Sequence, residues 1–145
     1  MARVLLIEDD PEQLELRASI LVQAGHQVET ASNLIGALER CGGCQVAVMD
    51  LIPQSEELLE QLRHAGTRII VLSGREPDRT ALSSRVDDFL VKPCPSQRLL
   101  ESIARVCLLL LLLLLAGPGT NAQTFRVSKQ SEVVADLDLR APGMD

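Results

Sequence analysis

The amino-acid sequence predicts an α/β fold built on a doubly wound, five-stranded parallel sheet. Short, mainly apolar runs recur at residues 3–7, 45–50, 68–72 and 88–91, residues 27–31 give a weaker strand pattern, and segments with helical patterns separate the five. This alternation is typical of parallel sheets with helices on both faces. The run at 45–50 is apolar throughout 46–49 and stops at Asp50, as expected of a strand buried on both faces.

The first helix is predicted to follow residue 10. Pro11 suits a first helical turn, Asp10 can cap it, and Gly25 can end it. The expected inward stripe consists of Leu14, Leu16, Ala18, Ile20, Leu21 and Ala24. This helix returns the chain to the start of the second strand.

Capping residues and apolar stripes also predict the later helices. Ser32 is expected to cap a helix that turns Leu34, Ile35 and Leu38 inward, and residues 55–64 are expected to bury Leu58, Leu59 and Leu62. A short helix is placed around residues 78–84. Pro95 then opens a last helix that begins at Ser96, with Leu99, Leu100, Ile103 and Val106 as its inner stripe.

Polar residues stand where four of the predicted strands end. Glu8 and Asp9 follow the first strand, Asp50 ends the third, Ser73 follows the fourth and Lys92 the fifth. Carboxyl ends of parallel strands meet at one edge of a sheet, where such folds bind ligands. Clustered carboxylates suit Mg²⁺, and a neighbouring hydroxyl and ammonium could hold an anion beside it.

Residues 2–107 resemble the receiver domains of two-component response regulators, most clearly in the string Asp87-Asp88-Phe89-Leu90-Val91-Lys92-Pro93. The resemblance implies a flavodoxin-like fold with strand order 2-1-3-4-5 and a Mg²⁺ cofactor. It implies that Glu8, Asp9, Asp50 and the backbone carbonyl of Ile52 bind the metal, with Asp10 as a possible additional acid. It also gives Asp50 as phosphoacceptor, Ser73 and Lys92 as its catalytic partners, and Phe89 as an aromatic switch.

The resemblance further implies a function as a phosphoryl-accepting receiver. A sensor histidine kinase would phosphorylate Asp50, and the chain would be no enzyme beyond self-catalysed transfer and slow autodephosphorylation. An alternative is a degenerate interaction module that works without phosphorylation, because Pro53 follows Asp50 one residue early and the segment before Lys92 is short for the family. A small hydrolase has little support, since nothing in the sequence supplies a base or a nucleophile beyond Asp50.

The C-terminal part departs from this pattern. Eight consecutive leucines at 108–115 extend the last helix, and a polar tail occupies 117–145. We expect a receiver domain at 1–107, a leucine-rich extension at 108–116, and a tail that is either unstructured or the start of a truncated winged-helix effector. The uninterrupted apolar run of 11 residues is short for a membrane span, so we expect the last helix to form a homodimer.

Composition limits the remaining classes of function. The net charge of −6 disfavours direct nucleic-acid binding, and the first strand is followed by no glycine-rich dinucleotide fingerprint. The spacing of Cys41 and Cys44 matches a redox or metal pair, but a turn between helix and strand favours incidental thiols. Met1 leads directly into a strand, so we expect a cytoplasmic protein.

Overall fold

The computed structural model describes residues 1–50, 55–74 and 85–116. The chain divides into two compact units, Met1–Leu110 and Leu111–Asp145, and the described part of the second unit is the end of helix α5. The elements, in chain order, are β1 (Arg3–Ile7), α1 (Pro11–Gln23), β2 (Gln27–Ala31), α2 (Leu34–Arg40), β3 (Val46–Asp50), α3 (Glu56–His64), β4 (Arg68–Ser73), β5 (Asp88–Val91) and α5 (Ser96–Ala116).

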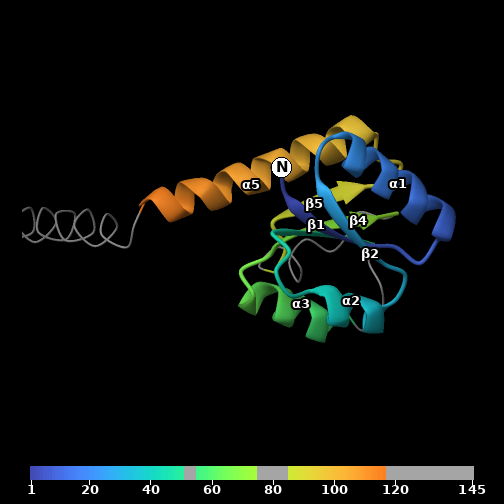
Figure 1. The fold of residues 1–145 in the computed structure, drawn as a ribbon, viewed down its shortest axis with the longest axis horizontal. Coiled ribbons are helices and arrows are strands. Elements are labelled where there is room, and N and C mark those ends of the chain that lie inside the picture. The colour runs from blue at the N-terminus through green and yellow to red at the C-terminus, as the bar shows by residue number, and fades with distance from the viewer. Residues whose placement is uncertain (51–54, 75–84, 117–145) are drawn as a thin grey trace, which may run out of the picture. The chain divides into compact units, whose positions relative to one another are not determined.

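The five strands form one parallel sheet in the order β2-β1-β3-β4-β5, which confirms the predicted topology. Helices α1 and α5 cover one face of the sheet, and α2 and α3 cover the other (Figure 1). Because every strand runs in the same direction, all five carboxyl ends lie at one edge. The predicted bounds of β1, β2 and β5 agree with the structure.

Alternating side chains of each strand enter two separate cores. On the face of α1 and α5, Leu6, Val48 and Ile70 pack with helix residues such as Leu21 and Ile103. On the opposite face the buried residues are Leu5, Ile7, Ala31, Ala37, Ala47, Met49, Leu58, Leu59, Leu62, Ile69 and Val71. Both cores are almost wholly aliphatic, and the apolar strands β1, β3 and β4 are buried on both sides, whereas the edge strand β2 is largely exposed.

The helix signals before α1 and in α3 are confirmed. The Asp10 carboxylate accepts hydrogen bonds from the backbone N–H groups of Glu12 (2.9 Å) and Gln13 (3.3 Å), and Pro11 occupies the first turn. Ser55 is the residue before α3, whose leucine stripe is buried as predicted.

Two helix faces were predicted correctly in part, with some residues assigned to the wrong side. Ile35 is 71% exposed, because the seven-residue helix α2 places Leu34, Ala37 and Leu38 toward the sheet. Asn33 rather than Ser32 caps that helix, with its side chain accepting the Gly36 N–H at 2.8 Å. Leu16 of α1 and Ala24, the residue that follows the helix, are exposed, since the inward face follows Leu14, Ala18 and Leu21.

Helix α5 buries Leu99, Ser102, Ile103 and Val106, while Leu100 is partly buried. Seven of the eight leucines at 108–115 are exposed, Leu110 being the exception. Among the described helices, α5 alone has the length and apolar composition to cross a membrane, with a mean hydropathy of 2.4. This is weak evidence for a span, because its first half belongs to the core. The predicted helix at 78–84, the Ile52 carbonyl and the tail at 117–145 lie outside the described residues.

Candidate functional site

The acidic residues predicted to act together lie together at the carboxyl edge of the sheet. Glu8 and Asp9 directly follow β1, and Asp50 is the last residue of the neighbouring β3, which pairs Ile7 with Met49. Each of these three carboxylates offers an oxygen within 4.8 Å of the others. Glu8 is buried, Asp50 is half-buried and Asp9 is exposed, so the cluster opens to solvent on one side.

Lys92 joins this cluster from the end of β5. Its Nζ lies 2.7 Å from Asp50 Oδ2 and 3.5 Å from Glu8 Oε2, so one ammonium group bridges two of the carboxylates. The backbone N–H of Lys92 donates to the carbonyl oxygen of Ser73 at 2.7 Å. The next residue is Pro93, joined to Lys92 by a cis peptide bond. The predicted neighbourhood of Asp50 and Lys92 is thus present in the folded chain.

Ser73 and Phe89 occupy the predicted elements. Ser73 is the buried last residue of β4, one strand away from Asp50, which pairs with Leu72 across the two strands. Phe89 lies in β5 opposite Val71 and packs, partly buried, on the core under α2 and α3. Ser73 therefore lies at the carboxyl edge of the sheet. Phe89 lies two residues before the end of β5.

The Asp10 carboxylate lies in a different environment from those of Glu8, Asp9 and Asp50. Its carboxylate caps α1, as described above, and its backbone N–H donates to Glu8 Oε1 at 3.3 Å. Among the described residues, the group of acids close enough to share a metal ion consists of Glu8, Asp9 and Asp50. Asp10 thus supports the site through the backbone and through the start of α1.

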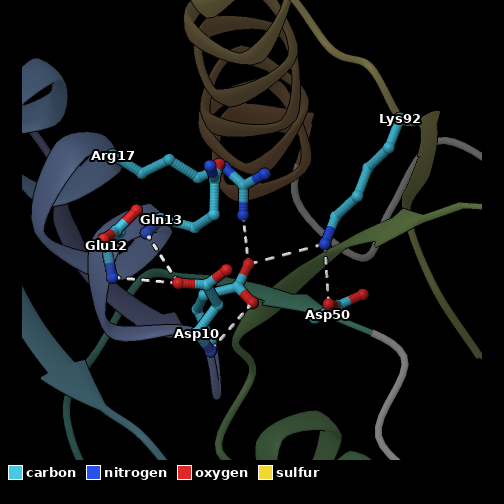
Figure 2. Close-up of polar contacts among 7 residues, drawn as sticks. Asp10, Glu12, Gln13, Arg17, Asp50 and Lys92 are labelled. Atoms are coloured by element: carbon cyan, nitrogen blue, oxygen red, sulfur yellow. Dashed lines mark hydrogen bonds and ion pairs between the residues drawn. The ribbon is translucent and has the colours of Figure 1, made fainter.

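Arg17 is a residue of the site that the sequence pattern did not predict. This residue of α1 forms an ion pair with Glu8 Oε2, and Figure 2 shows the side chains of Arg17 and Lys92 entering the site from two different elements. Glu8 is only 2% exposed, so its charge needs such partners. A signal was available, because Arg17 is a charged residue three positions after Leu14 and four before Leu21, on the inward face of α1.

The donor set fits a hard divalent cation. Three carboxylates offer the oxygen ligands that Mg²⁺ prefers, and the exposed Asp9 leaves room for the water ligands that Mg²⁺ usually keeps. Lys92 beside Asp50 provides a positive group for an anion attached there. The edge can therefore hold both a cation and a phosphate-like group.

The cysteines do not form a comparable site. Cys41 ends α2, and the Cys44 thiol donates to the Cys41 carbonyl oxygen at 3.3 Å. Burial raises the pKa of the Cys44 thiol, and likewise the pKa values of the Cys94 and Cys107 thiols. Thiols with raised pKa values are poor nucleophiles near neutral pH, which agrees with incidental cysteines.

The fold and the site together define a flavodoxin-like α/β domain with an acidic, lysine-bridged cluster at the carboxyl edge of its sheet. The response regulator receiver domain family model matches residues 4–104. The chain belongs to this family, the receiver domains of two-component response regulators.

Known relatives agree with this assignment. The chain is 29% identical over 114 residues to a protein named transcriptional regulatory protein CpxR homolog from Haemophilus influenzae, an alignment that covers 73% of this chain. The chain spans half the length of that relative.

Solved structures show the same fold. The response regulator TrrA from Thermotoga maritima, solved in complex with Mg²⁺-BeF, is 27% identical with a TM-score of 0.63, covering 73% of this chain and 99% of that one. The chemotaxis response regulator CheY4 of Vibrio cholerae is 25% identical with a TM-score of 0.65, covering 73% and 98%. A receiver domain from Clostridium thermocellum has a TM-score of 0.68 at 23% identity, covering 78% and 99%.

Proposed function

We propose that this receiver accepts a phosphoryl group on Asp50 from a sensor histidine kinase, with Mg²⁺ as cofactor. The observation that carries the proposal is the 2.7 Å contact between Lys92 Nζ and Asp50 Oδ2 within a cluster of three carboxylates. A carboxylate that contacts a lysine and lies close to two further carboxylates able to share a cation is prepared to become an acyl phosphate.

In the proposed transfer, the Asp50 carboxylate attacks the phosphorus of a phosphohistidine. A phosphorus–oxygen bond forms, the phosphorus–nitrogen bond breaks, and the kinase histidine leaves with the electron pair. Lys92 then pairs with a phosphoryl oxygen, and the Ser73 hydroxyl donates to another. Bound Mg²⁺ supplies positive charge against the phosphoryl oxygens, and Glu8, Asp9 and Asp50 would hold it.

The response to phosphorylation is proposed to travel through β4 and β5. Lys92 donates its backbone N–H to Ser73, so movement of either side chain toward a phosphoryl group acts on the same pair of strand ends. Phe89 lies three residues before Lys92 and is only partly buried, so a change of state could increase its burial. Such a two-state element can alter the surface of β5 and α5 toward partners.

To test this proposal, the protein is titrated with Mg²⁺ and then with beryllofluoride. Amide chemical shifts in NMR spectra report binding at each step. Saturable shifts at Asp9, Asp50, Ser73 and Lys92 are expected, with a larger second set when beryllofluoride is added. The Asp50→Asn variant is the matched control and should lose the beryllofluoride response. A wild-type protein that shows neither response would contradict the proposal and favour the alternative, an interaction module that works without phosphorylation.

The proposed function also implies a cellular location and a dimer partner for the chain. The chain is proposed to act in the cytoplasm, where sensor kinases present their phosphohistidine, and to pair with a second copy through the leucines of α5. Direct contact with nucleic acid is not part of the proposal, since the net charge is −6. Any output on DNA would need residues beyond those of the receiver.

A further inference from the structure

Arg17 stands where α1 would otherwise place an apolar side chain. Leu14 lies three residues before it and Leu21 four residues after it, and both pack on the core between α1 and the sheet. Residues at these spacings share one face of a helix. The Arg17 side chain is accordingly only 14% exposed, so its guanidinium group needs an acceptor inside the domain.

That acceptor is a carboxylate of the receiver site. Glu8 Oε2 pairs with the Arg17 guanidinium and lies 3.5 Å from Lys92 Nζ, while Glu8 Oε1 accepts the Asp10 N–H at 3.3 Å. Both oxygens of this buried carboxylate are thus held by donors of the chain itself. Figure 2 draws these contacts as dashed lines, together with the contact of the Lys92 ammonium group with Asp50.

We propose that Arg17 is a resident cation that competes with the divalent metal for Glu8 and so lowers the Mg²⁺ affinity of the site. This inference rests on the proposed function, because Glu8 is one of the three carboxylates that would hold the metal. Two positive groups at one carboxylate repel each other, and the repulsion grows where solvent is excluded. The coupling is reciprocal, so bound metal must also weaken the contact between Arg17 and Glu8.

The first test measures Mg²⁺ affinity by isothermal titration calorimetry, since the chain has no tryptophan or tyrosine to report binding. Arg17→Gln removes the charge and keeps a polar side chain, whereas Arg17→Lys keeps the charge. The Gln variant is expected to bind Mg²⁺ about tenfold more tightly than wild type, a common size for coupling between two ligands. The Lys variant should stay close to wild type. Equal or weaker binding by the Gln variant would overturn the inference.

A double-mutant cycle ties the effect to Glu8. In a Glu8→Gln background, Arg17→Gln should leave the Mg²⁺ affinity unchanged, because the competed carboxylate is gone. A gain that persists in this background would mean that Arg17 acts on the site as a whole and not through Glu8, which contradicts the proposal.

The wild-type protein supplies a readout that does not depend on the folding of any variant. The side-chain N–H signal of Arg17 should shift during a Mg²⁺ titration with the same midpoint as the amide signals of Asp9 and Asp50. An Arg17 signal that stays in place while those amides saturate would overturn the inference and leave the proposed function intact. Failure of Mg²⁺ to bind either wild type or Arg17→Gln would overturn the proposed function, and this inference with it.

Discussion

Lys92 Nζ and Asp50 Oδ2, 2.7 Å apart, join the ends of β5 and β3 across the intervening strand β4. Both side chains are partly exposed, 27% and 22%, so the pair is open to an incoming phosphoryl group. The pair therefore places a positive group beside the carboxylate at the edge where the proposed chemistry would occur.

Removing the ammonium group should slow phosphorylation. We predict that Lys92→Met lowers the rate of labelling by acetyl phosphate by about 10²-fold, the scale for loss of one preorganised donor to a developing charge. Lys92→Arg keeps the positive charge and should lose less, although its planar group differs in shape. Intact-mass measurement over time gives both rates. Labelling of Lys92→Met at the wild-type rate would argue against a role for this residue in transfer.

The buried Ser102 and the partly exposed Asp88 form a polar contact that should contribute to stability. The Ser102 hydroxyl donates to the Asp88 carboxylate, which also accepts from Arg105 and from the Phe89 N–H at 2.8 Å. Ser102→Ala should lower the free energy of unfolding by about 1.5–3 kcal/mol, as for hydrogen bonds to charged groups. Ser19→Ala, on the exposed face of α1, should change it by less than about 0.5 kcal/mol. Urea unfolding, monitored by circular dichroism, measures the free energy of unfolding of both variants and of wild type.

On the α2–α3 side of the sheet, truncating a core residue should lower the free energy of unfolding far more than truncating a surface residue. Leu62 is fully buried, so Leu62→Ala should destabilise the protein by about 2–5 kcal/mol through lost burial and a residual cavity. Ile35 is 71% exposed, so Ile35→Ala should change the free energy of unfolding by less than about 0.5 kcal/mol. Comparable losses in the two variants would mean that α2 packs with a different face toward the sheet.

His26 should make stability depend on pH. Burial lowers the pKa of His26, and its Nδ1 accepts the Ala2 N–H at 3.1 Å, which requires a neutral ring. The unfolded state therefore binds the proton more readily, so this contribution is present above the ordinary pKa of about 6.5 and is lost as the pH falls below it. His26→Asn keeps an acceptor without titrating. Its stability should fall less than that of wild type between about pH 7.5 and 5.5; parallel curves would contradict this.

The leucines of α5 should cause self-association. Burying one leucine side chain contributes roughly 1.5–3 kcal/mol to the free energy of association. Seven of the eight leucines at 108–115 are exposed. Changing Leu109, Leu112 and Leu113 together to Gln should shift the protein toward monomer in sedimentation velocity. Leu16→Gln, on the exposed face of α1, is the control and should have no effect. A wild type that stays monomeric at tens of micromolar would show that the prediction is wrong.

Strand positions and the site edge could be predicted from sequence because they depend on simple patterns. Four mainly apolar runs and one weaker segment define the strands, and the polar residues at the strand ends must meet when the strands are parallel. The buried stripe of α3 followed from its regular leucine spacing. These features depend on local periodicity and on the direction of the strands, which short motifs are sufficient to specify.

Other features depend on pairings between distant residues. The inward phase of α2 could not be read from seven residues in which Leu34, Ile35 and Leu38 are all apolar. Arg17 lies on the inward face of α1, where it pairs with the buried Glu8, and Ser102 of α5 is buried where its hydroxyl donates to Asp88 of β5. Such polar pairs override the apolar pattern, so they emerge only when both partners are placed in space.

The most direct test of the proposed function is phosphorylation of purified protein by acetyl phosphate with Mg²⁺, measured by intact mass. Wild type is predicted to gain one phosphoryl group, and Asp50→Asn is predicted to gain none. Glu60→Gln, on an exposed position of α3, is the control for removing a carboxylate and should be labelled like wild type. Labelling that persists in Asp50→Asn would contradict Asp50 as the acceptor, and a wild type that is never labelled would contradict phosphoryl acceptance itself.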